Sequence, residues 1–498
     1  MFPRLGSNYF SKIKSRDSKY VFFAIIFSLI CIGFWCFYEL SNLGTDYGKY
    51  YLEAKYINQD YKLYDEIFAH KGPTYFYFLK IIGNFLGWGL VNSIFSLLIS
   101  LFVFFIPIYF FILKSVENNS HKILLILMST SLLIGQHSNS SIAFFQEGLL
   151  LISFCFFFNY KKSFSSFLLA QIFFWLSFFT RVDIVVFLPL NFVYSLIFVL
   201  KQKKLLNRFF SVFIIFAPPI ILFIFFSNYF NFNWDQYFEH NFTFNRWYSN
   251  LLVGNNLITR MQQLFYRPLA LSLGAQTLII PFVFYFLVKD INNLIFIKSK
   301  IFSQNIREKF LWIFFLLATL GFLLTNSDKN YFALIILCPG IFFVIKRFSD
   351  DSNYLKLSFM PILFFCIAIN TSSLMKNIKS VYYGQNFIPP YQRTIDYVKQ
   401  NKLSEIELIG GLGWPYLISG AAPNRAVNDW WFYLPDSPYI TKGLLKQHEN
   451  LLKRPKGYIF WIDNELIEKN QNNKFFNEII LRSVKIEDQN FYSMYEIK

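Results

Sequence analysis

Residues 41–87 read SNLGTDYGKYYLEAKYINQDYKLYDEIFAHKGPTYFYFLKIIGNFLG, and they lie between the first and second long apolar runs of the chain. The stretch is rich in tyrosine, lysine and carboxylates, and it is far longer than a connection between two neighbouring helices needs to be. Asp46, Tyr50 and Ile57 recur at helical spacing, which predicts a short helix over 46–57 that lies on the membrane. A loop of this length indicates a functional segment.

The composition is that of a membrane protein. Of 498 residues, 55% are hydrophobic, 67 are phenylalanine and only 15% are charged, whereas soluble domains carry roughly 25% charged residues. Repeated apolar runs have the ~17–25 residues that a helix needs to cross ~30 Å of hydrocarbon. All five cysteines lie inside these runs, so they predict neither a disulfide framework nor a metal cluster. The sequence therefore predicts an α-helical polytopic membrane protein.

The net charge of +17 is concentrated in the membrane portion. Residues 386–498 carry 14 Lys and Arg against 13 Asp and Glu, so about +16 belongs to the part before residue 386. There the basic residues cluster at the ends of apolar runs. This placement indicates membrane orientation and contact with anionic lipid headgroups, and it argues against a nucleic-acid partner.

The apolar runs predict about eleven transmembrane helices. The expected spans fall near 21–40, 88–113, 123–136, 143–158, 165–179, 184–200, 210–228, 271–288, 310–325, 331–345 and 357–372. An odd number of spans places the two ends of the chain on opposite sides of the membrane. A second long loop at 229–270 interleaves aromatic residues with Asn, Arg and His, which favours short helices lying at the membrane interface. A cytoplasmic amphipathic helix is expected over 289–309.

The distribution of basic residues predicts the orientation. The segments assigned to the cytoplasm carry 21 Lys and Arg in 76 residues, whereas the segments assigned to the outside before residue 386 carry them at less than half that density. Because cytoplasmic loops are enriched in Lys and Arg, the N-terminus is expected inside and the C-terminus outside. The predicted location is the plasma (inner) membrane, with several spans.

The C-terminal segment has a different composition. After about residue 385, apolar runs shorten to strand length and turn residues appear. Helices are predicted at 391–401 and 443–453, and strands at 406–412 and 458–463 and at the chain end. We therefore predict two domains: a transmembrane domain at 1–385 with external loops 41–87 and 229–270, and a small external α/β domain at 386–498 that covers the site or helps to choose acceptors.

The loop motif resembles a known superfamily. Asp46 begins D-Y-G-K-Y-Y-x-x-A-K, and residues 62–87 continue K-L-Y-D-E-I-F-x-H-K-G-P-T-Y-F-Y-F-L-K-I-I-G-N-F-L-G. This string resembles the first external loop of the C-type glycosyltransferases (GT-C), especially bacterial relatives of the protein O-mannosyltransferases and aminoarabinose transferases. It departs from them at Tyr47, where the O-mannosyltransferases have Glu, and at Gly72, which replaces the first proline of a Lys-Pro-Pro string.

The resemblance implies an inverting hexosyl- or pentosyltransferase that takes its sugar from a polyprenyl-phosphate carrier. Asp46 matches the acidic active-site residue that follows the first helix, and His70 and Lys71 match the later string. Asp46 is the candidate for the catalytic base that accepts the proton of the acceptor hydroxyl, with an aspartate that only caps the helix at 46–57 as the alternative. The leaving lipid phosphate requires fixed cations, for which Lys71 and Arg181 are the candidates.

Further candidates follow from position and from the resemblance. Arg181, beside Asp183, lies in a hairpin between two spans, where a solvated ion pair is the alternative. Glu147, near the start of the fourth span, is a candidate for binding sugar hydroxyls. The alternative is that Glu147 is placed there only because a carboxylate near the N-terminus of a helix interacts favourably with the helix dipole. Lys329 and Tyr331 resemble the polar turn that precedes a late span in the family, and Lys329 is the candidate there for binding the donor phosphate; an ordinary loop lysine and an interfacial tyrosine are the alternative. The candidate substrate contacts are Tyr50, His70, Glu147 and Tyr331.

The sequence is compatible with three functions. The first is a membrane glycosyltransferase that uses a polyprenyl-phosphate sugar and delivers it to a glycolipid, a lipid-linked glycan or a lipopolysaccharide component. The second is a polytopic transporter or flippase of lipid-linked glycans, and a glycan polymerase or ligase is a further possibility. The partners expected are the donor, a lipid or glycan acceptor and membrane lipids. The five histidines show no metal-ligand spacing, so no cofactor is expected, and metal dependence is open.

Overall fold

The computed structural model describes part of the chain. The described residues are 16–39, 46–65, 67, 69, 71–134, 141–158, 163–246, 392–403, 405–409, 422–423, 451–469, 474–488 and 492–498. Four predicted spans, between 271 and 372, lie outside these ranges, as do most of loop 229–270 and the helix expected at 289–309. The sequence-predicted number of spans therefore stays a prediction.

Seven predicted spans form helices within a few residues of their expected bounds. They are α2 (Arg16–Glu39), α5 (Leu90–Ser115), α6 (Asn119–Ile134), α7 (Ser141–Phe158), α8 (Phe164–Phe178), α9 (Leu188–Leu200) and α10 (Leu205–Phe230), with a 3-10 turn, η2 (Val182–Phe187), before α9. By length and apolar composition, three helical stretches of the described part can cross a membrane: Ile94–Ser115, Val182–Leu200 and Leu205–Phe230. Helices are expected here because a chain in hydrocarbon must satisfy its backbone polar groups internally.

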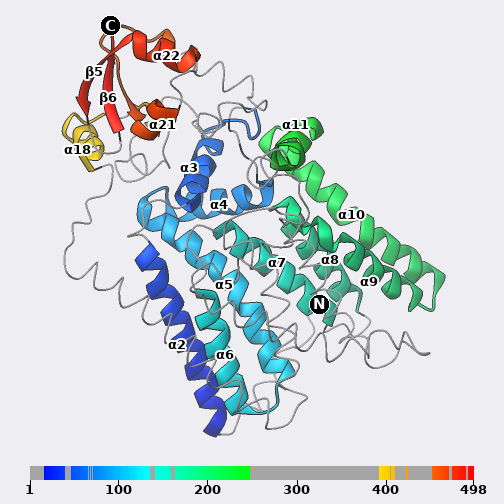
Figure 1. Cartoon of the computed structure of the whole chain (residues 1–498). Coiled ribbons are helices and arrows are strands. Elements are labelled where there is room, and N and C mark those ends of the chain that lie inside the picture. Colours follow the sequence, from blue (N-terminus) through cyan, green and yellow to red (C-terminus); the bar gives the residue numbers. More distant parts are fainter. Residues whose placement is uncertain are drawn as a thin grey trace, which may run out of the picture.

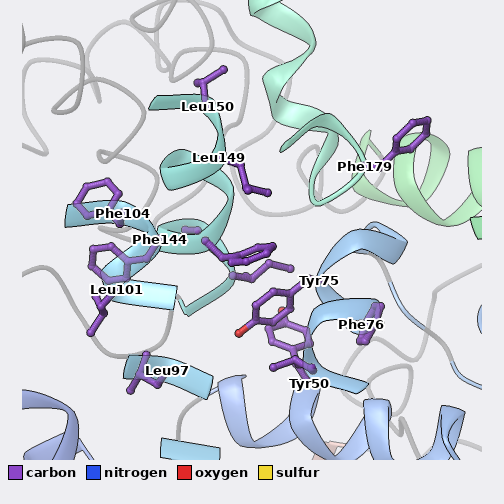
Figure 2. Close-up of a cluster of buried hydrophobic side chains, with 14 of the residues drawn as sticks. Tyr50, Tyr75, Phe76, Leu97, Leu101, Phe104, Phe144, Leu149, Leu150 and Phe179 are labelled. Carbon is purple, nitrogen blue, oxygen red and sulfur yellow. The ribbon is translucent and has the colours of Figure 1, made fainter. Parts of the chain in front are cut away.

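Close packing of α5 against α7 forms the centre of the bundle. A Cβ on Gly148 of α7 would lie 2.7 Å from the backbone of Val103 in α5, so only glycine permits this approach. The rings of Phe104 and Phe144 meet edge to face at 5.1 Å, close to that crossing. Figure 2 draws the buried cluster around it, with Leu97, Leu101 and Phe104 from α5, Phe144, Leu149 and Leu150 from α7, and Tyr50, Tyr75 and Phe76 from the loop helices.

Two helices form within the first long loop. The predicted helix over 46–57 is present as α3 (Asp46–Ile57). A second helix, α4 (Pro73–Leu86), forms where the sequence pattern predicts only loop. Proline is favoured at the start of a helix because its missing N–H would have no helical partner there, and Pro73 supplies this start. Figure 1 shows α4 lying across one end of the bundle, with α3 beside it.

Short helical turns also follow α10, as the aromatic pattern predicts for the second loop. They are α11 (Trp234–Phe238) and a π turn, η3 (Glu239–Thr243). Asn233 caps α11 through reciprocal hydrogen bonds with Gln236, at 2.8 and 3.0 Å. This segment is more than a surface element, because Tyr237, His240 and Asn241 are buried. It lies at the same end of the helix bundle as α3 and α4 (Figure 1).

The C-terminal segment contains a mixed sheet. Its elements are α18 (Gln392–Gln400), β1 (Glu405–Ile406), β2 (Leu408–Ile409), β3 (Ala422–Pro423), β4 (Ile459–Asp463), α21 (Asn464–Lys469), α22 (Lys474–Leu481), β5 (Ser483–Asp488) and β6 (Tyr492–Ile497). The strands run in the order β2-β4-β6-β5, with β2 parallel to β4 and the other pairs antiparallel, and β1 pairs separately with β3. The helix at 391–401 and the strands at 458–463 and the chain end form as expected. Most of the helix expected at 443–453 lies outside the described residues.

Candidate active site

Backbone pairing docks the start of α4 onto the turn after α8. The N–H of Gly72 donates to the carbonyl of Thr180 at 2.8 Å, and the N–H of Thr74 donates to the carbonyl of Phe179 at 3.1 Å. A Cβ on Gly72 would overlap the carbonyl oxygen of Phe179. The glycine in the Lys-Gly-Pro string is therefore required by close approach, and this approach brings Lys71 next to the segment that contains Arg181.

The Arg181 side chain forms a buried ion pair. Its Nη2 lies 2.7 Å from Oδ2 of Asp183, and Arg181 is only 6% exposed. This burial excludes the solvated pair that the sequence left open. Gln146 of α7 holds the segment from the other side, because its side-chain amide donates to the carbonyl of Arg181 at 3.0 Å and to Oδ1 of Asp183 at 2.6 Å. Ser177 completes the link by donating to the carbonyl of Gln146 at 2.8 Å.

Glu147 is a buried carboxylate within electrostatic reach of both Arg181 and Asp183. It lies in the second turn of α7 and is 3% exposed, which does not fit a carboxylate placed in the first turn to favour the helix dipole. Its Oε2 has no hydrogen-bond partner among the described residues, and the same holds for Oε1 of Gln146 and Oγ1 of Thr74. Buried polar atoms are normally satisfied, so three such oxygens around one turn indicate a place for water or a polar ligand.

Lys71 is the second buried cation of this region. It is 7% exposed, and the hydroxyl of Tyr64 donates to its carbonyl at 2.8 Å. Lysine is rarely buried to this extent, because transfer of its ammonium from water is costly. Lys71 and Arg181 are predicted from separate parts of the sequence, and the Gly72–Thr180 hydrogen bond brings their backbones together.

The helix α3 contributes Tyr50 to the same neighbourhood. Tyr50 is buried, with its ring 6.0 Å from Tyr75 and 6.3 Å from Phe76 of α4. Tyr75 in turn lies 5.5 Å from Phe145, the residue before Gln146. Figure 2 shows Tyr50 and Tyr75 close together. The predicted base, Asp46, is the first residue of α3, and its side chain lies outside the described part of the structure.

The structure also adds residues that the sequence reasoning missed. Glu53 is a buried carboxylate on α3, three residues after Tyr50 and so on the same helix face. Its spacing from Asp46, two helical turns, is the signal that would have identified it. Gln146 lacks such a signal, because its role depends on contacts with Arg181 and Asp183, far along the chain.

Three predicted residues, His70, Lys329 and Tyr331, lie outside the described residues, so their positions stay predictions. Within the described ranges, no group of three His, Cys, Asp or Glu residues is placed to hold a metal ion. The described part places the backbone beside Lys71 on the turn that carries the buried Arg181–Asp183 pair, and Glu147 lies within electrostatic reach of that pair. Such a set can bind a phosphate through the cations and sugar hydroxyls through carboxylate or amide oxygens.

These features define a class of protein: a helical membrane protein with a buried, charged site at one end of its bundle. Among solved structures, the chain resembles ArnT from Cupriavidus metallidurans bound to undecaprenyl phosphate, with a TM-score of 0.56 over 95% of this chain and 97% of ArnT, at 10% sequence identity. ArnT from the same organism in the apo state aligns over the same shares with a TM-score of 0.42 and 10% identity. No protein-family model and no curated protein matches the sequence.

Proposed function

We propose that the protein is a membrane glycosyltransferase that transfers a sugar from a polyprenyl-phosphate donor to an acceptor at the outer face of the membrane. The acceptor class is a glycolipid, a lipid-linked glycan or a lipopolysaccharide component. The observation that carries the proposal is the docking of the Lys71 segment onto the Arg181 segment through Gly72 and Thr180. The fold resembles that of ArnT, which was solved with undecaprenyl phosphate bound.

The reaction assigned to this site is a single displacement. The acceptor oxygen attacks the anomeric carbon, the bond from that carbon to the phosphate oxygen breaks, and polyprenyl phosphate leaves with the bonding electrons. The acceptor proton passes to the carboxylate of Asp46, the proposed base. Sugar hydroxyls are the proposed partners of Glu147, Tyr50, His70 and Tyr331.

The cations are assigned to the leaving group. As the bond breaks, the phosphate gains negative charge, and fixed positive groups favour the transition state most where they are shielded from water. Lys71 and Arg181 are both largely buried, so they fit this requirement, and Lys329 is proposed as a third phosphate contact. The partner carboxylate, Asp183, orients the guanidinium through the 2.7 Å ion pair.

Purified protein incubated with a labelled polyprenyl-phosphate sugar and candidate acceptors tests the proposal. Asp46→Asn should abolish transfer, whereas Asp60→Asn should leave it unchanged, because Asp60 is an exposed carboxylate of the same loop. Full transfer by Asp46→Asn would remove this residue from the mechanism.

The cation assignment has its own matched pair of variants. Lys71→Met should reduce release of polyprenyl phosphate by at least about 100-fold, and Lys80→Met should not, because the Lys80 ammonium lies over the ring of Tyr229, 4.8 Å from its centroid. Equal activity in the two variants would contradict the assignment. Movement of an intact lipid-linked glycan across a vesicle membrane, with no bond broken, would instead support the transporter alternative.

A further inference from the structure

We propose that Tyr64 is a positioning residue for Lys71, held in place by a buried aromatic latch from the segment after α10. The latch consists of Phe232, Tyr237 and His240, which pack around the Tyr64 ring. The inference rests on the proposed function, in which the Lys71 ammonium contacts the donor phosphate. Tyr64 itself touches no reacting atom and acts through the backbone of Lys71.

Tyr64 adopts a backbone conformation that bulky residues rarely take. Its φ is +69°, in the left-handed region. The surrounding turn holds it there, because the N–H of Tyr64 donates to the carbonyl of Ile67 at 3.0 Å and the N–H of Ile67 donates to the carbonyl of Lys62 at 3.1 Å. Residues in such conformations persist only where their surroundings over-determine them. The position of the Tyr64 ring is thus fixed by the turn and the latch.

From this fixed position the Tyr64 hydroxyl contacts the backbone of a residue seven positions later in the chain. It donates to the Lys71 carbonyl at 2.8 Å, while the next residue, Gly72, is hydrogen-bonded to Thr180 at 2.8 Å. The Lys71 backbone is therefore held on two sides, by the loop that precedes it and by the turn that contacts α4. Both bonds restrict the direction in which the long lysine stem leaves the backbone.

The latch contacts both the Tyr64 ring and the turn at Phe179, onto which the start of α4 docks. The Tyr64 ring centroid lies 5.0 Å from Phe232 and 5.3 Å from His240. Tyr237 lies 6.1 Å from Tyr64 and 5.9 Å from Phe179, whose carbonyl accepts from Thr74. One aromatic residue of the second loop therefore packs against the first loop and against the turn on which that loop docks.

His240 suits this position electrostatically. It is buried within hydrogen-bonding reach of the backbone at Ala69 and Tyr64, and burial lowers its pKa to about 4. The imidazole is therefore neutral near pH 7 and places no second positive charge beside the Lys71 segment. The latch contributes shape through its ring contacts with Tyr64, and the cation of the segment remains Lys71.

Tyr64→Phe tests the inference, because it keeps the ring packing and removes only the hydroxyl. The full-length variant in detergent or liposomes should show a kcat about tenfold lower with a polyprenyl-phosphate sugar, since a small displacement of a catalytic group is sufficient for such a loss. The KM for the donor should change less than twofold. Tyr109→Phe is the matched control, because it removes a buried tyrosine hydrogen bond, 2.7 Å to Thr130, in a different part of the bundle.

A double variant separates positioning from general stability. If Tyr64 acts through Lys71, then Tyr64→Phe should cause no further loss of kcat in a Lys71→Met background. The inference is overturned if Tyr64→Phe behaves like Tyr109→Phe, or if its effect persists undiminished without the lysine. Unchanged activity in Lys71→Met alone would instead contradict the proposed function.

A second variant covers the case in which Tyr64→Phe does not accumulate. Phe232→Leu loosens the packing on the Tyr64 ring and leaves the hydroxyl in place. It should lower kcat in the wild-type background and have no effect in the Lys71→Met background. An equal loss in both backgrounds would overturn the inference.

Discussion

Gly72→Ala places a methyl group where the Phe179 carbonyl oxygen lies. The backbone at Gly72 has φ −76° and ψ 162°, which any residue can adopt. Strain in the glycine backbone therefore plays no part, and the whole effect must come from steric overlap with the turn. To relieve it, the Lys71–Thr74 segment has to move away from Phe179 and Thr180.

The structure gives the magnitude of this perturbation. Separation breaks the 2.8 Å bond from Gly72 to Thr180 and the 3.1 Å bond from Thr74 to Phe179. Each buried backbone bond contributes about 0.5–1.5 kcal/mol net, and a donor left unsatisfied costs about 1–3 kcal/mol. Partial relaxation reduces the total, so we expect a loss of roughly 2–5 kcal/mol in the free energy of unfolding. Under the proposed function, displacing the Lys71 ammonium by about 1 Å should also reduce sugar transfer about 100-fold.

Thermal unfolding in detergent and transfer from a labelled polyprenyl-phosphate sugar measure the two effects. Gly33→Ala is the control, because a Cβ at Gly33 in α2 meets no atom within 4 Å; it should be neutral or slightly stabilising. Gly72→Pro should be at least as harmful as Gly72→Ala, because proline also lacks the N–H that bonds to Thr180. Docking as described is refuted if Gly72→Ala matches Gly33→Ala in both Tm and activity.

Three further predictions concern buried groups. Burial lowers the pKa of His240 from 6.5 to about 4, so the wild type should lose up to roughly 3 kcal/mol of stability as the pH falls from 6.5 to 4, because only the unfolded chain binds a proton there. His240→Phe should remove this pH dependence, and Tm measured against pH tests it. Asp183→Ala leaves the buried Arg181 guanidinium without its 2.7 Å partner and should lower stability by about 3 kcal/mol, measured by thermal unfolding. Gly148→Ala should destabilise the α5–α7 crossing by about 1–3 kcal/mol, measured in the same assay.

Each of these predictions has a contradicting outcome. Parallel Tm–pH curves for wild type and His240→Phe between pH 4 and 6.5 would argue against a neutral buried imidazole. An Asp183→Ala variant as stable as Asp60→Ala, which removes an exposed carboxylate, would show that the Arg181 pair is not buried. Gly148→Ala with an unchanged Tm would mean that α5 and α7 are farther apart than the structure has them.

Local patterns predicted most of the described elements. Residues 143–158 and 210–228 form α7 and α10 nearly as expected, because an apolar run of sufficient length has one low-energy backbone arrangement in lipid. The run at 458–463 forms β4 for a related reason, since its apolar residues are buried in a small sheet. The sequence pattern did not predict the helix α4. Its tyrosines and lysine obscure the helical spacing of the apolar residues, such as Phe76 and Leu79, that the helix buries.

The sequence by itself determined that this is a helical membrane protein with a charged loop after its first span, because hydrocarbon length, helical spacing and charge distribution are properties of neighbouring residues. It also singled out Lys71, Arg181 and Glu147 as candidates. Only the tertiary structure decided that the backbone beside Lys71 docks onto the turn that contains Arg181, that Gln146 holds this turn, and that Tyr64 is packed by the segment after α10. Those contacts join residues far apart in the chain through steric fit and single hydrogen bonds, which leave no periodic signal in the sequence.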